Sequence, residues 1–148
     1  MTWTVYLSGE IHTDWRDQII NGATENSLPV TFTGPITDHS ASDECGVNIL
    51  GAEDDPFWHD HKGAKINAIR TRNLIRKADI VVVRFGEKYR QWNAAFEAGY
   101  ACALNIPVIV MHNPEHRHAL KEVDASALAV TQTPVQVVEI LAYVTTKK

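Results

Sequence analysis

One carboxylate stands alone in an apolar segment of the sequence. Between Ala94 and Leu104 the only charged side chain is Glu97, and small residues surround it on nearly every face of a helical pattern. A helix that is apolar all round is buried in a fold or in a subunit contact. A carboxylate there costs free energy unless it is paired or faces a pocket. Glu97 is therefore either bonded to a neighbouring backbone N–H, Arg16 or Arg84, or it is a nucleophile or base tuned by apolar surroundings.

The elements that would position this carboxylate alternate between strand and helix patterns along the whole chain. Strands are predicted at 4–8, 28–33, 78–85, 106–111 and 127–131, and helices at 13–23, 64–77, 91–105, 116–121 and 133–145. This alternation predicts one α/β domain over residues 1–148, built on a five-stranded parallel sheet covered by helices on both faces. The expected architecture is a flavodoxin-like or Rossmann-like three-layer sandwich with strand order 2-1-3-4-5.

In such a fold, ligands bind outside the carboxyl ends of the strands, where the strand order reverses. This rule selects residues 8–16, 34–63, 84–93 and 112–118 as the places to look for chemistry. Asn93 precedes Glu97 by four residues, so both lie on one helix face. The candidate substrate-binding residues in these segments are Ser8, Gly9, Glu10, His12, Arg16, Asp55, His59, Arg84, Gln91, Trp92 and Asn93.

Residues 36–63 show no periodicity and many Asp, His and Ser residues, which predicts a long functional loop. Its aromatic residues either stack on a base or anchor the loop on the core. A metal site would use His59 and His61, yet this spacing fits no standard zinc signature. We therefore expect no metal and no cofactor, and interpret the segment as an acidic lid over the crevice.

Composition excludes several classes of function. The formal net charge is −4 and the 14 Lys and Arg residues are scattered, so binding to nucleic acid is not expected. No apolar run is long enough for a membrane span, and the first residues lack the features of a signal peptide. Cys45 and Cys102 form no disulfide framework. A cytoplasmic protein is predicted, without the glycine-rich motifs of dinucleotide or P-loop enzymes.

Three stretches together resemble the nucleoside 2-deoxyribosyltransferase superfamily, and its YtoQ branch in particular. They are V-Y-L-S-G-E-I-H, A-D-I-V-V-V-R-F and W-N-A-A-F-E-A-G-Y-A-C-A-L-N-I-P-V-I-V, which span Val5 to about Val110. The resemblance implies that Glu97 is a nucleophile that attacks C1′ of a nucleoside and forms a covalent glycosyl ester. It also implies that Ser8, Gly9 and Glu10 form a sugar or phosphate loop, and that Asp79 has a structural capping role.

The sequence departs from the family pattern around this nucleophile. The position of the usual assisting Asp is Thr71, and the residue six before the nucleophile is Gln91. Asn93 and Ala95 replace the usual glycines. These departures imply a changed substrate or a different N-glycoside, with Asp54, Asp55 or His59 as substitutes for the missing acid.

The function that follows is an N-glycosyl hydrolase or transferase acting on a small-molecule nucleoside or nucleotide. The alternative is a non-catalytic nucleotide-binding or sensor module that uses the same crevice, and a metal-dependent hydrolase is a distant third. A homo-oligomer, dimer or higher, is expected from the apolar helix and from the resemblance.

Overall fold

The computed structural model describes residues 1–146. Its elements, in chain order, are β1 (Trp3–Gly9), α1 (Trp15–Glu25), β2 (Val30–Thr33), α2 (His39–Leu50), α3 (Pro56–Arg76), β3 (Ile80–Arg84), α4 (Trp92–Ala103), β4 (Val108–Met111), the short 3-10 helix η1 (Pro114–His116), α5 (Lys121–Ser126), β5 (Ala129–Thr131) and α6 (Pro134–Thr145). None of the helices within residues 1–146 is long and apolar enough to cross a lipid bilayer.

The five strands form one parallel sheet in the order β2-β1-β3-β4-β5, which confirms the predicted α/β topology. β1 lies inside the sheet, with Val5 opposite Phe32 of β2 on one side and opposite Ile80 of β3 on the other. The order reverses between β1 and β3. The carboxyl ends of these two strands therefore flank the crevice in which a ligand is expected.

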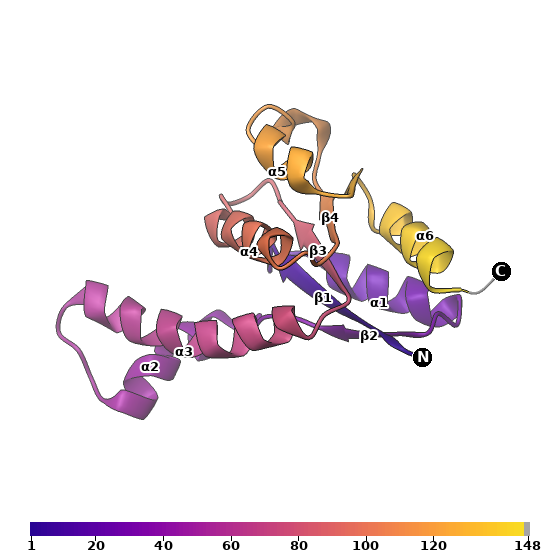
Figure 1. Cartoon of the computed structure of the whole chain (residues 1–148). Helices are drawn as coiled ribbons and strands as arrows, with labels where there is room; N and C mark the ends of the chain where they lie inside the picture. The colour runs from indigo at the N-terminus through magenta and orange to yellow at the C-terminus, as the bar shows by residue number, and fades with distance from the viewer. Residues whose placement is uncertain (147–148) are drawn as a thin grey trace.

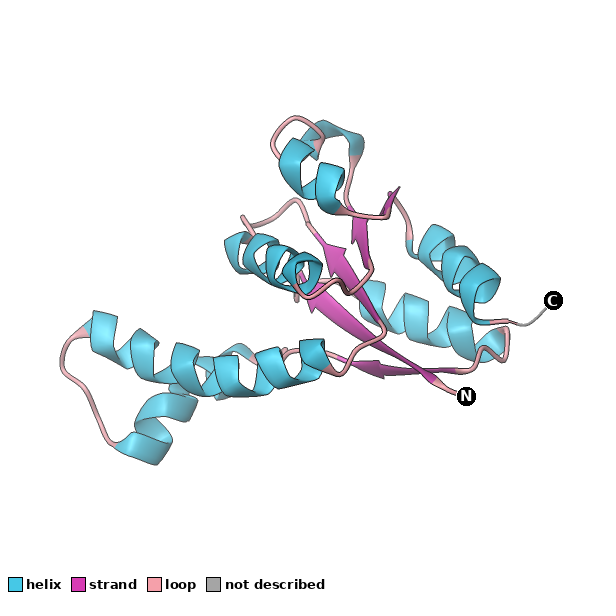
Figure 2. Ribbon diagram, in the orientation of Figure 1, coloured by secondary structure: helices cyan, strands magenta, loops and turns pink. Residues whose placement is uncertain are grey.

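Alternation along the strands separates two apolar cores, one on each face of the sheet. Val82 packs with α1 and α6 residues on one face. Val81 and Val83 pack with residues of α3 and α4 on the other. Figure 2 shows the helices distributed over both sides of the strands. Because Tyr6 belongs to the second core, Ser8, two residues further along β1, also faces α4.

The prediction of a long loop over residues 36–63 is wrong, because most of this segment is helical. α2 and α3 up to Arg70 form an antiparallel pair, here called the arm (residues 39–70), which projects from the sheet (Figure 1). The arm contributes no side chain to either core. A helix without a core to face needs no apolar stripe, so it lacks the periodicity by which helices are predicted.

The two helices of the arm approach each other through glycines. A Cβ added to Gly46 of α2 would lie 2.4 Å from the backbone nitrogen of Gly63 in α3. Asn67 secures the same contact, since its amide nitrogen donates to the carbonyl and the hydroxyl oxygens of Ser42 at 3.0 and 3.2 Å. The arm is therefore held by close backbone contact rather than by buried apolar side chains.

Candidate active site

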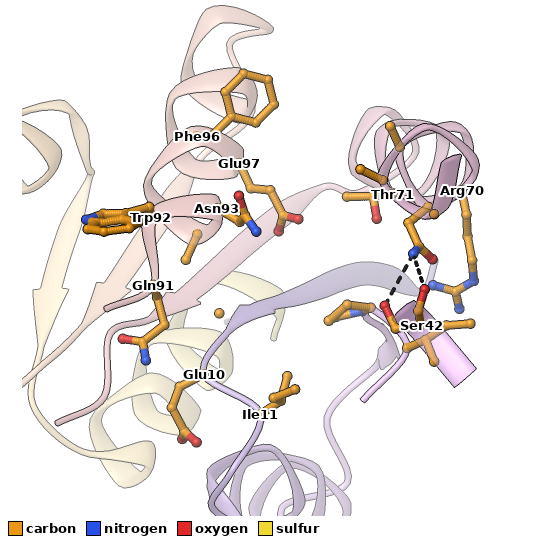
Figure 3. A pocket seen from close by; sticks show the side chains of 18 of the residues that line it. Glu10, Ile11, Ser42, Arg70, Thr71, Gln91, Trp92, Asn93, Phe96 and Glu97 are labelled. Carbon is orange, nitrogen blue, oxygen red and sulfur yellow. Dashed lines mark hydrogen bonds between the residues drawn. The ribbon is translucent and has the colours of Figure 1, made fainter. Parts of the chain in front are cut away.

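Glu97 projects from α4 into a cavity of about 1070 Å³ beside the carboxyl ends of β1 and β3. The arm and α4 form opposite walls of this cavity. Figure 3 shows Glu97 directed from α4 toward Thr71 of α3, with Asn93 beside it. The cavity is large enough for a nucleoside or nucleotide, since ligand pockets typically measure about 300–1,000 Å³.

Glu97 accepts a short hydrogen bond from the hydroxyl of Ser8, at the end of β1. Burial raises the pKa of the Glu97 carboxyl, while the Ser8 hydrogen bond and then the positive charge of Arg16 lower it. Ser8 itself is fully buried. The strand end thus fixes one carboxylate oxygen, and the environment holds the group nearer to its neutral form than an exposed glutamate.

Tyr6 is a site residue that was not identified as a candidate from the sequence. It is fully buried, and its hydroxyl has no hydrogen-bond partner of good geometry. Burial and then the charge of Glu97 raise the pKa of the Tyr6 phenol, whereas the Thr71 hydroxyl and the cations Arg70 and Arg16 lower it. The available signal was its spacing, because residues two apart on a strand share a face and Ser8 was already a candidate.

The loop after β1 is shaped by Gly9 and Glu10. Gly9 has φ +104°, and a Cβ there would lie 2.1 Å from the carbonyl oxygen of Arg84. The buried carboxylate of Glu10 accepts the backbone N–H of His12 and, at 2.5 Å, the hydroxyl of Thr13. Arg84 Nε lies 3.8 Å from the same carboxylate. Glu10 lines the cavity, but its hydrogen bonds organise the loop.

Arg16 is placed behind this loop rather than in the cavity. Its guanidinium donates to three backbone carbonyls, those of Leu7 at 3.1 Å, Gly9 at 3.0 Å and Glu10 at 2.6 Å. These bonds occupy each guanidinium nitrogen. Arg16 therefore supports the strand end and acts on Glu97 through its charge, in contrast to the substrate contact expected from its position in the sequence.

The start of α4 brings the next three candidates to the cavity. Gln91 accepts the backbone N–H of Gly86 at 3.0 Å, so its side chain fixes the turn after β3. Trp92 is 73% exposed, and its ring lies 5.9 Å from the guanidinium of Arg90. Asn93 is exposed at the cavity wall. Of the three, Asn93 is the polar side chain directed toward the space beside Glu97 (Figure 3).

Asp55 and His59 lie near the far end of the arm and do not line the cavity. Asp55 is the N-cap of α3 and accepts the backbone N–H of Phe57 at 2.9 Å. His59 lies 3.3 Å from Glu44 and 3.5 Å from Asp60. Both residues therefore have local partners in the arm. Neither lies where it could take the place of the carboxylic acid that is missing at position 71.

Besides Glu97 and Glu10, several titratable side chains line the cavity from the loops after β1 and β3 and from α2 and α3. The His12 ring stacks on His39 of α2 at 5.6 Å between ring centroids and contacts Tyr89 at 4.6 Å. Asp43 and Asp60 line the arm side. Among residues 1–146, His, Cys, Asp and Glu side chains form no group of three or more that could hold a metal ion.

Asp79 has the structural role expected of it. Its carboxylate accepts the backbone N–H of Thr4 at 2.8 Å, and its own N–H donates to the Thr4 carbonyl at 2.8 Å. These bonds align the beginnings of β1 and β3. The ends of the same strands are thereby set side by side at the cavity.

Solved structures with the same fold include two bacterial proteins of similar length. A conserved protein from Enterococcus faecalis V583 superposes with a TM-score of 0.64 at 12% identity, covering 97% of this chain and 99% of that one. A 2-deoxyribosyltransferase from Bacillus psychrosaccharolyticus superposes with a TM-score of 0.54 at 17% identity, covering 91% and 90%. At these identities the likeness shows the fold alone.

Sequence comparison is more specific. The family model described as "Nucleoside 2-deoxyribosyltransferase YtoQ" matches residues 6–145. A protein of Bacillus subtilis (strain 168), named "Uncharacterized protein YtoQ", is 41% identical over 143 residues, which is 97% of this chain and 97% of that protein. The chain therefore belongs to the YtoQ family of nucleoside 2-deoxyribosyltransferase-like proteins.

Proposed function

We propose that the protein is an N-glycosyl hydrolase or transferase that acts on a nucleoside or nucleotide, with Glu97 as the nucleophile. The observation that carries the proposal is the Ser8–Glu97 hydrogen bond at the wall of the cavity. A carboxylate that is held by one oxygen keeps the other free to attack. Membership of a nucleoside 2-deoxyribosyltransferase-like family supports the substrate class.

In the proposed reaction an oxygen of Glu97 attacks C1′ of the sugar and forms an ester bond as the C1′–N bond to the base breaks. The electron pair of that bond leaves with the base, which takes up a proton. Water, or the nitrogen of a second base, then attacks C1′ and loses a proton. The ester bond breaks and Glu97 is restored as a carboxylate.

Position 71 holds a threonine and not a carboxylic acid, so the leaving base must receive its proton from another group. Thr71 occupies the wall opposite Glu97, and its hydroxyl is too weak an acid for this role. Imidazoles donate protons near neutral pH. His12 and His39, which stack on each other at the cavity, are therefore the donors that we propose.

The missing carboxylic acid also favours a second candidate function, a nucleotide-binding or sensor module without turnover. Such a module would use the same cavity and the same contacts from Asn93 and the β1 loop. It would bind the ligand without breaking the C1′–N bond. The two functions differ in product, which makes them separable by experiment.

The test is incubation with a panel of nucleosides and 5′-nucleotides, with released base measured by chromatography. We expect wild-type protein to release base from at least one compound, and Glu97→Ala to lower the rate by about 10³-fold or more. The matched control is Glu122→Ala, which removes an exposed glutamate from α5 and leaves the rate unchanged. Mass spectrometry of acid-quenched enzyme should detect a glycosyl adduct on Glu97, and the added mass distinguishes ribose from deoxyribose.

Two results would decide against the enzyme. Wild-type protein that binds a nucleotide but releases no base would establish the sensor function instead. Base release that survives in Glu97→Ala would remove Glu97 from the role of nucleophile.

A further inference from the structure

His112 is a buried histidine that does not line the cavity and takes no part in the proposed reaction. It follows β4 directly, and its backbone N–H donates to the carbonyl of Thr131 in β5 at 3.0 Å. Its side chain is 1% exposed. Burial of an imidazole is costly unless its polar atoms have hydrogen-bond partners. Both ring nitrogens must therefore be satisfied by neighbouring protein atoms.

Both ring nitrogens of His112 face oxygen atoms that only accept hydrogen bonds. Nδ1 lies 2.7 Å from the backbone carbonyl oxygen of Asn113. Nε2 lies 3.0 and 2.9 Å from the two carboxylate oxygens of Asp124 in α5. A neutral imidazole has one N–H and one bare nitrogen, so it can donate to only one of these partners. Both contacts are therefore hydrogen bonds only while a proton lies between Nε2 and Asp124 as well as on Nδ1.

The titratable groups in contact with the His112 ring, among residues 1–146, are Asp124 of α5 and His116 of η1. The centroid of the His116 ring lies 6.3 Å from that of His112. Nε2 of His116 is buried without a hydrogen-bond partner. A positive charge on that ring would be repelled by an imidazolium at His112. The counter-ion of His112 is therefore Asp124, whose carboxylate lies against Nε2.

Asn113 connects this pair to the cavity. Its side-chain amide donates to the carboxylate of Glu87, in the loop between β3 and α4 (residues 85–91, here called the β3–α4 loop). The same loop carries Tyr89, which lines the cavity and contacts the ring of His12 at 4.6 Å between centroids. The carbonyl that accepts from the imidazole and the amide that holds the loop belong to one residue. A change in the backbone of Asn113 would therefore reach the cavity wall through a single side chain.

We propose that His112 and Asp124 form a pH-sensitive latch that fixes the β3–α4 loop at the wall of the cavity. In the closed latch the imidazolium donates to the Asn113 carbonyl and to the Asp124 carboxylate. As the pH rises, one ring proton passes to solvent. The remaining N–H stays with the carboxylate, because hydrogen bonds to a charged acceptor are the stronger ones. The bare Nδ1 then faces the Asn113 carbonyl oxygen, and the repulsion between their lone pairs turns Asn113 and releases Glu87.

The first test is nuclear magnetic resonance of wild-type protein labelled with nitrogen-15, from about pH 6 to about pH 10. The ring-nitrogen shifts distinguish an imidazolium from either neutral tautomer, and correlation with the backbone of the same residue assigns them to His112. We expect both nitrogens to be protonated at neutral pH, and Nδ1 to lose its proton as the pH rises. A ring that is already neutral at the acidic end, or an imidazolium that persists to the basic end, overturns the proposal.

Hydrogen exchange measures the effect of the latch on the loop. The amide of Gly86 donates to Gln91 within the β3–α4 loop, and the amide of His116 donates to the carbonyl of Asn113. After correction for the intrinsic effect of pH, both amides should exchange at least about tenfold faster once the imidazolium is lost. Amides of β1 should keep their rates. Equal acceleration in β1 would show a loss of global stability instead, which contradicts a local latch.

Asp124→Asn separates the latch from a contact that is merely structural. The asparagine amide can donate to a bare Nε2, so a neutral His112 keeps its Nδ1–H on the Asn113 carbonyl and every hydrogen bond is satisfied without the additional proton. We therefore expect the two reporter amides to remain protected at high pH in this variant. If Asp124→Asn retains the pH dependence of the wild type, the proposal is wrong.

Glu122→Gln is the matched control, because it removes a carboxylate charge from an exposed position on the same helix. This variant should show the pH dependence of the wild type, and a flat profile would mean that the net charge of α5, rather than the His112–Asp124 contact, controls the loop. None of these measurements requires turnover. A failed latch and a failed enzyme are therefore distinguishable.

Discussion

The two walls of the cavity are built in different ways. The wall formed by the end of β1 and by α4 is held by partly buried hydrogen bonds, among them the three from Arg16 to backbone carbonyls and the one from Ser8 to Glu97. The wall formed by the arm is held by the close approach of Gly46 to Gly63, and Asn67 adds hydrogen bonds to Ser42. It adds no side chain to either core.

This difference assigns different tasks to the two walls. The proposed nucleophile, Glu97, is carried by the wall that cannot move without breaking partly buried hydrogen bonds. The arm determines the width of the cavity and its far polar side chains. We therefore expect substitutions in the first wall to change stability and rate, and substitutions in the arm to change substrate binding.

The largest expected effect on stability comes from replacing Gly9, in comparison with Gly51, a second glycine with positive φ. Gly9→Ala places a Cβ at 2.1 Å from the Arg84 carbonyl oxygen, between the two central strands, and should cost about 3 kcal/mol or more. Gly51→Ala, at φ +96° in the arm with no atom within 4 Å of the added Cβ, should cost about 1 kcal/mol. Urea denaturation of both variants measures the difference.

Equal losses of unfolding free energy in Gly9→Ala and Gly51→Ala would contradict the proposed difference between the two walls. They would mean that backbone conformation alone, and not the contact between the strand ends, determines the cost. If Gly9→Ala cannot be recovered as soluble protein for the denaturation experiment, that result, together with a normal yield of Gly51→Ala, would agree with the expected difference.

A smaller effect is expected from Gly46→Ala in the arm. The added Cβ lies 2.4 Å from the Gly63 nitrogen, so α2 must move away from α3. Overpacking of this kind costs about 1–3 kcal/mol, and we expect the cost to fall on the arm alone. Hydrogen exchange should become faster in residues 39–61 and stay unchanged in the sheet, while KM rises and kcat changes little. Faster exchange throughout the sheet would show that the arm is not separable from the body.

The smallest effect concerns the hydroxyl that contacts the carboxylate. Ser8→Ala removes the hydrogen bond that lowers the Glu97 pKa, so this pKa rises further. In the proposed reaction Glu97 acts in its ionised form, and activity should therefore grow as pH rises through that pKa. The acidic limb of the kcat/KM profile should move to higher pH, with a loss on the order of tenfold at neutral pH. Ser126→Ala, on the exposed side of α5, is the control. If the acidic limb of Ser8→Ala stays where it is in the wild type, Ser8 does not influence the ionisation of Glu97.

The sheet was predictable because its strands are short runs rich in β-branched, aliphatic and aromatic residues, bounded by turn residues. Ile80–Arg84 is buried on both faces, and its sequence is a continuous run of Ile and Val before the final Arg84. The arm was not predictable by the same means. α2 buries only Gly46, so nothing in its sequence repeats with the period of a helix.

The candidate site was predicted only in part, because some of its residues leave a signal in the sequence and others do not. Glu97 is visible in the sequence because a charge among alanines is rare, and Asn93 follows from its helical spacing. The direction of a side chain leaves no such signal. Arg16 was expected to contact substrate, yet from α1 it turns back onto the carbonyls at the end of β1. Tyr6 was overlooked because a tyrosine in a strand is also typical of a core.

The interior place of β1 in the sheet has a consequence for the order in which the protein is made. β1 precedes the other four strands of the sheet in the chain, and its neighbour β3 ends only at residue 84. Until β3 has been synthesised, β2 is the one strand of the sheet with which β1 can pair, and the arm precedes β3 in the chain. Parallel pairing over such distances in sequence is slow. The chain through residue 84 must therefore be synthesised before the strand end that carries Ser8 is enclosed on both sides.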